Sequence, residues 1–96
     1  MKVIWAPLAL ERVSRIADYI AQDNPSAARR WVIQVFRKVK PLSRFPERGR
    51  QVPETLRRDI RELQFPPYRI IYRIRGRQVG ILTVRHGKQR FPYGEV

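Results

Sequence analysis

The sequence predicts an α+β domain in which a small antiparallel sheet carries a helical hairpin on one face. Two segments in the N-terminal half have apolar residues at helical spacing, whereas from Arg57 onward apolar and polar residues alternate as in strands. A short apolar run, Lys2–Trp5, precedes the helices and is expected to form a strand. The predicted order is therefore β-α-α-β-β-β, in a single domain spanning residues 1–96.

The two helices are expected at Leu8 to about Gln22 and at Ser26 to about Val39. Pro7 suits the start of the first helix, and Asn24 followed by Pro25 forms an N-cap and first position for the second. The short connection between the helices favours an antiparallel hairpin. The apolar stripe of the first helix is Leu10, Val13, Ile16, Ala17 and Ile20. The stripe of the second is Ala28, Val32, Val35, Phe36 and Val39.

A loop punctuated by prolines and glycine follows the helices, from Pro41 to Pro53. Leu42 and Phe45 are its large apolar residues, and we expect both side chains to enter the core. Three arginines crowd into the same loop. They are Arg44, Arg48 and Arg50.

The remaining strands are predicted at Ile60–Phe65, Tyr68–Ile74 and Val79–Val84, with a turn at Arg75–Arg77. The middle strand alternates an apolar face, which should take the helices, with a face that carries arginines. A three-residue turn places Arg69 near Thr83 and Arg85, whereas a two-residue turn places it near Val84 and His86. The sequence leaves both registers open.

The composition excludes several classes of protein. There is no cysteine, so disulfides, Cys-ligated metals and thiol nucleophiles are ruled out, which fits a reducing cytoplasm. One histidine and eight scattered acidic residues offer no metal-ligand spacing, and we expect no metal and no cofactor. The apolar runs are too short for a membrane span, and Met1–Ala9 lacks a signal-peptide pattern. A cytoplasmic protein without membrane association is expected.

The net charge of +13 is the strongest functional signal in the composition. Lysine and arginine total 21 against eight acidic residues, and all but four of the basic residues are arginine. A compact domain of this charge is expected to bind a polyanion or an acidic protein, and arginine favours bidentate contact with phosphate or carboxylate. The residues expected to bind the target are Arg44, Arg48, Arg50, Arg61, Arg69, Arg73 and Arg85.

The order of motifs resembles the ParE/RelE toxin superfamily of type II toxin–antitoxin systems, the plasmid stabilization proteins, over nearly the whole chain. Its N-terminal landmarks are Trp5 with Pro7–Ala9, Ile16, Tyr19–Ile20, Asn24–Pro25 and Ala27–Ala28. Its later landmarks are Leu42, Phe45–Pro46, Gly49–Arg50, Val52–Glu54, Arg61–Glu62, Tyr68–Tyr72, Ile81–Val84, His86 and Arg90. Within the superfamily the sequence is most similar to the ParE branch.

The resemblance implies a toxin that is neutralised by a cognate antitoxin, in a hetero-oligomer with it. ParE-type members poison DNA gyrase, and this non-enzymatic activity is the function we expect here. RelE-type members instead cut messenger RNA on the ribosome, which is the alternative. A second alternative is a degenerate toxin that only binds its antitoxin. From the charge of +13 we expect the antitoxin to present an acidic tail.

Five residues are catalytic candidates if the chain is a RelE-like, metal-independent endoribonuclease. By resemblance, Arg69, Arg85 and Arg90 would stabilise phosphate, His86 would act as general acid and Glu54 as general base. The sequence also departs from that pattern. Counting back from Arg69, Ile60 and Glu62 occupy the places of two lysines that RelE-like nucleases carry, and only Tyr93 offers a C-terminal tyrosine.

Three of these candidates also have a structural alternative. Arg69 is able to pair with Glu62 across adjacent strands, His86 to act as a hydrogen-bonded residue at a strand end, and Glu54 to cap a turn or short helix after Pro53. Under the gyrase hypothesis, reversing the charges of Arg69 and Arg85 is expected to abolish toxicity without unfolding the domain.

Overall fold

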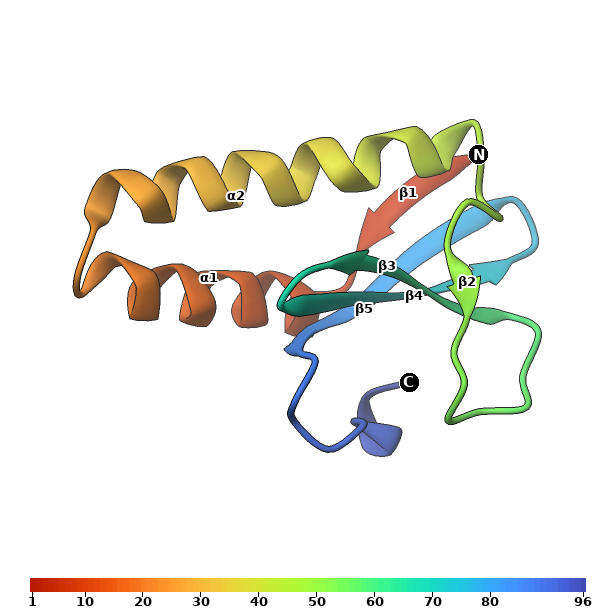
Figure 1. Cartoon of the computed structure of the whole chain (residues 1–96). Helices are drawn as coiled ribbons and strands as arrows, with labels where there is room; N and C mark the ends of the chain where they lie inside the picture. The colour runs from red at the N-terminus through yellow and green to blue at the C-terminus, as the bar shows by residue number, and fades with distance from the viewer.

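A computed structural model describes residues 1–96, in which two antiparallel helices cover one face of a five-stranded sheet (Figure 1). This confirms the predicted α+β fold, but the sheet has one strand more than the predicted order, because the short strand Arg50–Gln51 lies in the segment expected to be a loop. The strands are β1 Lys2–Trp5, β2 Arg50–Gln51, β3 Ile60–Phe65, β4 Tyr68–Arg75 and β5 Gln78–His86. The helices are α1 Pro7–Ala21, α2 Pro25–Val39 and the 3-10 turns η1 Lys40–Ser43 and η2 Tyr93–Glu95. No helix combines the length and the apolar character needed to cross a membrane.

The sheet has the order β1-β5-β4-β3-β2 and is mixed rather than fully antiparallel. β1 runs parallel to β5, with Lys2 opposite Gln78, while the other neighbours are antiparallel. A parallel pair requires a long connection, which here is the whole chain between the two strands. The sequence predicted the strand β1 but not its direction, because no turn joins it to its partner.

The main core lies between the helices and the sheet and follows the predicted stripes with three corrections. Leu10 is 44% exposed, because the stripe of α1 begins with the buried Ala9 instead. Phe36 is 40% exposed and packs its ring against Trp5, while Trp31 takes the buried position on α2. Phe45 is 59% exposed, whereas Leu42 is fully buried as predicted.

The β4–β5 hairpin combines a two-residue turn with an irregular register. Arg75 pairs with Gln78 around Gly76, whose φ of +58° suits the first central position of a type II′ turn. A bulge then inserts one residue of β5, because Ile71 pairs with Thr83 but Tyr72 pairs with Ile81.

The bulge sets the partner of Arg69. A regular ladder from this turn would place Arg69 opposite Val84, but the extra residue, Leu82, brings Arg69 opposite Arg85. It also lets both Ile81 and Val84 face the helices. Neither register considered from the sequence included a bulge.

The face of the sheet away from the helices carries a second, smaller core. Val52, Ile60, Ile71 and Phe91 are buried there together. Phe91 belongs to the C-terminal segment, which folds back across this face after β5 (Figure 1). The arginine-bearing face predicted for β4 is therefore only partly open to solvent.

The loop before β2 is tethered to the sheet by Tyr72. The Tyr72 hydroxyl donates a hydrogen bond to the carbonyl of Pro46 at 2.7 Å and accepts one from the Gly49 amide at 2.9 Å. Arg61 donates from Nη1 to the Gly49 carbonyl at 2.8 Å. These bonds hold the segment that carries Arg48 in a fixed position beside the sheet.

Candidate functional site

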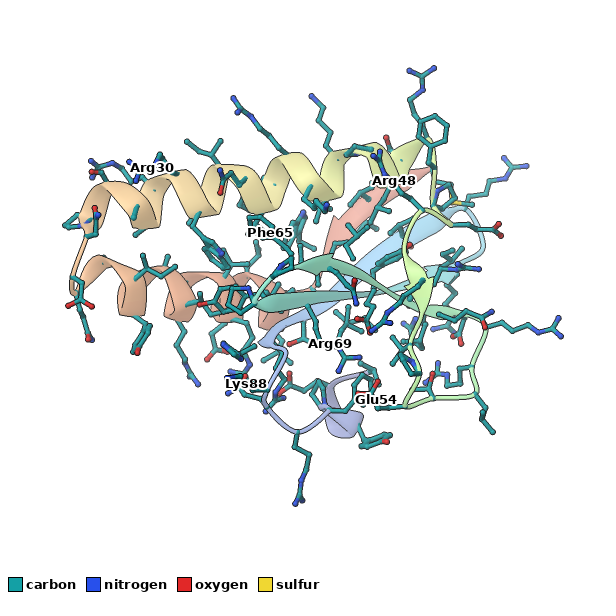
Figure 2. All side chains as sticks on the ribbon, viewed as in Figure 1. Arg30, Arg48, Glu54, Phe65, Arg69 and Lys88 are labelled. Carbon is teal, nitrogen blue, oxygen red and sulfur yellow. The ribbon has the colours of Figure 1, made fainter.

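Arg69 lies at the centre of an ion cluster on the face of the sheet away from the helices. Its two terminal nitrogens donate to the two carboxylate oxygens of Glu54, each at 2.8 Å. Its Nε donates to both carboxylate oxygens of Glu62 at 3.2 Å, and Nη2 also donates to Glu62. Figure 2 shows Arg69 and Glu54 directed toward each other. The guanidinium is thus enclosed by two carboxylates.

The strand register brings these groups together. Glu62 on β3 pairs with Ile71 and Gln64 with Arg69, so Glu62 and Arg69 are diagonal neighbours on one face. The Glu62 side chain is 0% exposed, and Arg50, on the next strand, reaches it at 3.3 Å. The pairing of Arg69 with Glu62 that the sequence offered as a structural alternative is therefore present, and Glu54 adds to it.

The cluster shifts the pKa of Glu54 and that of Arg69 in the direction that keeps each side chain charged. Hydrogen bonds from Arg69 lower the pKa of the Glu54 carboxyl, and hydrogen bonds to Glu54 raise the pKa of Arg69. The guanidinium carbon of Arg69 also lies 5.3 Å from the centre of the Phe91 ring, within cation–π distance. Every donor of Arg69 that faces the cluster is therefore engaged within the protein.

A polar pocket of about 360 Å³ opens beside this cluster, and Arg50, Glu54, Glu62 and Arg69 line it. Tyr93 reaches the same region, where its hydroxyl donates to the Glu54 carbonyl at 3.2 Å. Two of the five catalytic candidates, Glu54 and Arg69, meet in this pocket. No group of three or more side chains in it, or elsewhere, is arranged to hold a metal ion.

His86 lies on the opposite face of the sheet from Arg69. It follows Arg85 on β5 and packs its ring against Tyr68, on the helix side, at 5.5 Å between ring centres. Its Nδ1 accepts a hydrogen bond from the Lys88 amide at 3.0 Å. Arg90 is exposed in the turn after β5. The structure therefore brings Glu54 and Arg69 together, with Arg85 on the same face, but places His86 and Arg90 elsewhere.

Arg85 belongs to a second cluster that the sequence analysis missed. Glu95, near the C-terminus, accepts hydrogen bonds from Arg12 on α1 and Thr83 on β5, both at 2.8 Å, and lies 3.6 Å from Arg85. The Arg12 hydrogen bond, supported by Thr83 and the nearby Arg85, lowers the pKa of the Glu95 carboxyl. No motif or spacing around Glu95 signals this role, because its partners come from distant elements.

Replacing Glu95 with glutamine is expected to change how stability depends on pH. Because folding lowers the pKa of Glu95, its ionised carboxylate stabilises the domain above the pKa of an unfolded glutamate, about 4.3. This stabilisation is lost as the pH falls through the lower pKa of the folded state. Glu95→Gln should therefore be less stable than wild type in urea unfolding at pH 6, with the difference shrinking toward pH 3. Glu47→Gln, an exposed residue in no ion pair, should show no such difference. A difference for Glu95→Gln that is constant with pH would contradict the assigned role.

The residues predicted to bind the target fall into two groups. Arg44 and Arg48 are exposed and make no ion pair, and Arg50 is half exposed beside Glu62. Arg61, Arg69 and Arg85 are engaged in the internal contacts described above, and Arg73 is partly buried on the far face. Reversing Arg69 would place three acidic groups together, so the expectation that this substitution leaves the domain folded is not supported.

Comparison with known proteins decides the family. The family described as "ParE toxin of type II toxin-antitoxin system, parDE" matches residues 3–91. The chain belongs to the ParE toxin family. Its order of motifs had suggested the same membership.

Two curated toxins are similar to this ParE-family chain. "Toxin RelE2" of Caulobacter vibrioides is 36% identical over 85 residues, which cover 88% of the chain and 93% of that protein. "Putative toxin Y4kP" of Sinorhizobium fredii is 40% identical over 93 residues, covering 95% of the chain and 93% of the relative.

A solved structure has the same fold as the ParE-family chain. The "Chromosomal ParDE TA system from P. aeruginosa" contains a chain that superposes with a TM-score of 0.75 and 25% sequence identity. The match covers 90% of the present chain and 95% of the other. The protein is accordingly a toxin of the type II toxin–antitoxin class.

Proposed function

We propose that this ParE-family toxin arrests growth by binding and poisoning DNA gyrase, without catalytic chemistry of its own, and that a cognate antitoxin neutralises it. The observation that carries the proposal is the state of Arg69. A nuclease needs an arginine that is free to meet a phosphate, but Arg69 is enclosed by Glu54 and Glu62. His86, the candidate general acid, faces the other side of the sheet. Both features support a toxin that acts by binding.

The exposed arginines of the loop before β2 are the proposed target contacts. Arg44 and Arg48 have no internal partner, and the Tyr72 hydroxyl fixes the loop that carries them. Because the loop backbone is already fixed, binding has to order only the exposed side chains, and their charge favours contact with an acidic protein surface. Phe45 lies between them and exposes 59% of its surface, so it adds an apolar anchor to the same loop.

The antitoxin is proposed to dock on the outer groove between the helices. A pocket of about 510 Å³ there is lined mainly by small apolar residues, including Ala17, Ala28 and Val32, and its charged lining residues are Arg29 and Asp18. An amphipathic segment with apolar residues on one side and acidic residues on the other matches this lining and the charge of the chain. The groove is separate from the loop that carries Arg44 and Arg48.

The test is to induce the chain without antitoxin in bacteria and to assay purified gyrase. We expect filamentous cells, a DNA-damage response and loss of supercoiling activity. Arg44→Glu/Arg48→Glu should relieve both effects while remaining folded by circular dichroism. The matched control is Arg58→Glu/Lys88→Glu, which reverses two exposed cations on other loops and should stay toxic.

Other outcomes would overturn the proposal. Rapid translation arrest with cuts in messenger RNA, lost in His86→Ala and Glu54→Ala, would establish the RelE-like nuclease instead. Soluble protein without any growth arrest would identify a degenerate toxin that only binds antitoxin. Equal toxicity of the Arg44/Arg48 variant and its control would show that this loop does not contact the target.

A further inference from the structure

The second helix and the start of the loop after it form a segment without any acidic residue. Residues 24–46 contain no aspartate or glutamate but carry six basic residues. They are Arg29, Arg30, Arg37, Lys38, Lys40 and Arg44. All six are exposed, and none makes an ion pair, although six arginines elsewhere in the chain do. A run of unpaired cations along one segment points to a partner that supplies the negative charge.

The helix geometry arranges these cations along the outer surface of α2. Ala28, Val35 and Val39 face the core, so positions 30 and 37 lie on the opposite side of the helix. Arg30 and Arg37 are seven residues apart, about 10 Å along the axis. In Figure 2 Arg30 lies near the start of α2, and Arg48 lies in the loop that passes the other end.

A small polar pocket continues this line at the C-terminal end of the helix. It has a volume of about 260 Å³, and Lys38, Arg48 and Arg50 line it from three different elements. Only one of its seven lining residues is hydrophobic. Glu62 also lines the pocket and pairs with Arg50, so Lys38 and Arg48 are its unpaired cations. Two unpaired cations with little apolar lining suit a phosphodiester group.

We propose that the outer surface of α2 and this pocket, together the α2 basic track, bind the sugar–phosphate backbone of duplex DNA without sequence preference. Each strand of a duplex carries a charge about every 3.4 Å, so the 10 Å between Arg30 and Arg37 spans about three phosphates. Proteins that hold single strands stack bases on exposed aromatic rings. The outer surface of α2 offers no row of such rings, because Trp31 is buried and Phe36 packs on Trp5, and Phe45 in the following loop is a single exposed ring.

Binding to bare DNA is measured without gyrase, so the result does not depend on whether gyrase is the target. The experiment is fluorescence anisotropy with a 20-base-pair duplex of random sequence at 50 and 200 mM salt. Arg30→Gln/Arg37→Gln should weaken binding about tenfold at 50 mM and reduce the salt slope by about 2. The control Arg58→Gln/Lys88→Gln removes the same charge from exposed loops and should change affinity less than about twofold.

Three results would overturn the proposal. Equal weakening by both variants would mean that only net charge matters. Absence of duplex binding by the folded wild type at 50 mM salt would exclude a DNA surface. Tighter binding to a polyglutamate peptide, or to a single-stranded RNA 20-mer, would assign the track to a protein or RNA partner. Thermal unfolding of both variants checks that neither loss of affinity comes from misfolding.

Discussion

Replacing Arg69 with methionine should lower the free energy of unfolding by about 3–5 kcal/mol, because it leaves a buried carboxylate without its main partner. Glu62 is fully buried, and besides Arg69 only the half-exposed Arg50 reaches it. For a domain of this size the loss corresponds to a melting temperature lower by more than about 12 °C. Urea and thermal unfolding followed by circular dichroism measure both quantities.

Two further variants separate the buried pair from ordinary surface charge. Arg50→Gln removes the other cation at Glu62, but that pair is half exposed and should cost less than about 1 kcal/mol. Arg69→Met/Glu62→Leu removes both buried charges and should recover stability to within about 2 kcal/mol of wild type. An Arg69→Met variant as stable as wild type would show that the carboxylates do not depend on Arg69.

The double variant also tests function. If Arg69 only maintains the fold, the stable Arg69→Met/Glu62→Leu protein should still arrest growth when it is expressed. A double variant that is stable but not toxic would instead indicate that Arg69 contacts the target. Stability and toxicity are thereby read separately from one protein.

Local sequence patterns predicted most of the fold because its elements are bounded by local signals. Asn24 and Pro25 start the second helix as expected, and the Asn24 side chain accepts a hydrogen bond from the Ala27 amide at 3.0 Å. The alternation of Tyr68, Ile70 and Tyr72 placed the correct face of β4 on the helices. These features depend on neighbours within a few residues.

The features that were not predicted from the sequence depend on contacts between distant segments. The bulge at Leu82 fixes Arg69 opposite Arg85, yet neither Leu82 nor its neighbours Ile81 and Thr83 is a glycine or proline that would mark it. Phe45 stays outside because the loop is held by the Tyr72 hydroxyl and Arg61, not by its own apolar residues. Glu95 gathers partners from α1 and β5 that lie far from it in sequence. Each was visible only once the chain had folded.

The structure also divides the arginines by what they do. Arg12, Arg61 and Arg69 make hydrogen bonds that hold the C-terminal segment, the loop before β2 and the second core in place. Arg44 and Arg48, with the cations of α2, make none and face solvent. From the composition alone, all of these arginines were expected to form one basic surface. Target binding is better sought among the second group, since the first is already occupied.

Replacing Gly49 with alanine is expected to have the second large effect, because it acts where the target loop meets the sheet. An added Cβ would lie 2.5 Å from the Glu62 carbonyl oxygen and 2.6 Å from the Tyr72 hydroxyl. Both neighbours are fixed, one as backbone of β3 and the other by two hydrogen bonds to the loop. Overpacking together with the loss of these bonds should cost about 3 kcal/mol.

The same substitution should weaken gyrase inhibition more than its effect on stability requires. When Gly49 is pushed off the sheet, the Tyr72 tether releases Arg44 and Arg48, so even the folded fraction presents them poorly. Gly94→Ala is the matched control, since nothing lies within 4 Å of its added Cβ, and it should match wild type in both assays. Supercoiling assays at equal concentrations of folded protein make the comparison. Full inhibition by folded Gly49→Ala would mean that target binding does not need the loop in this position.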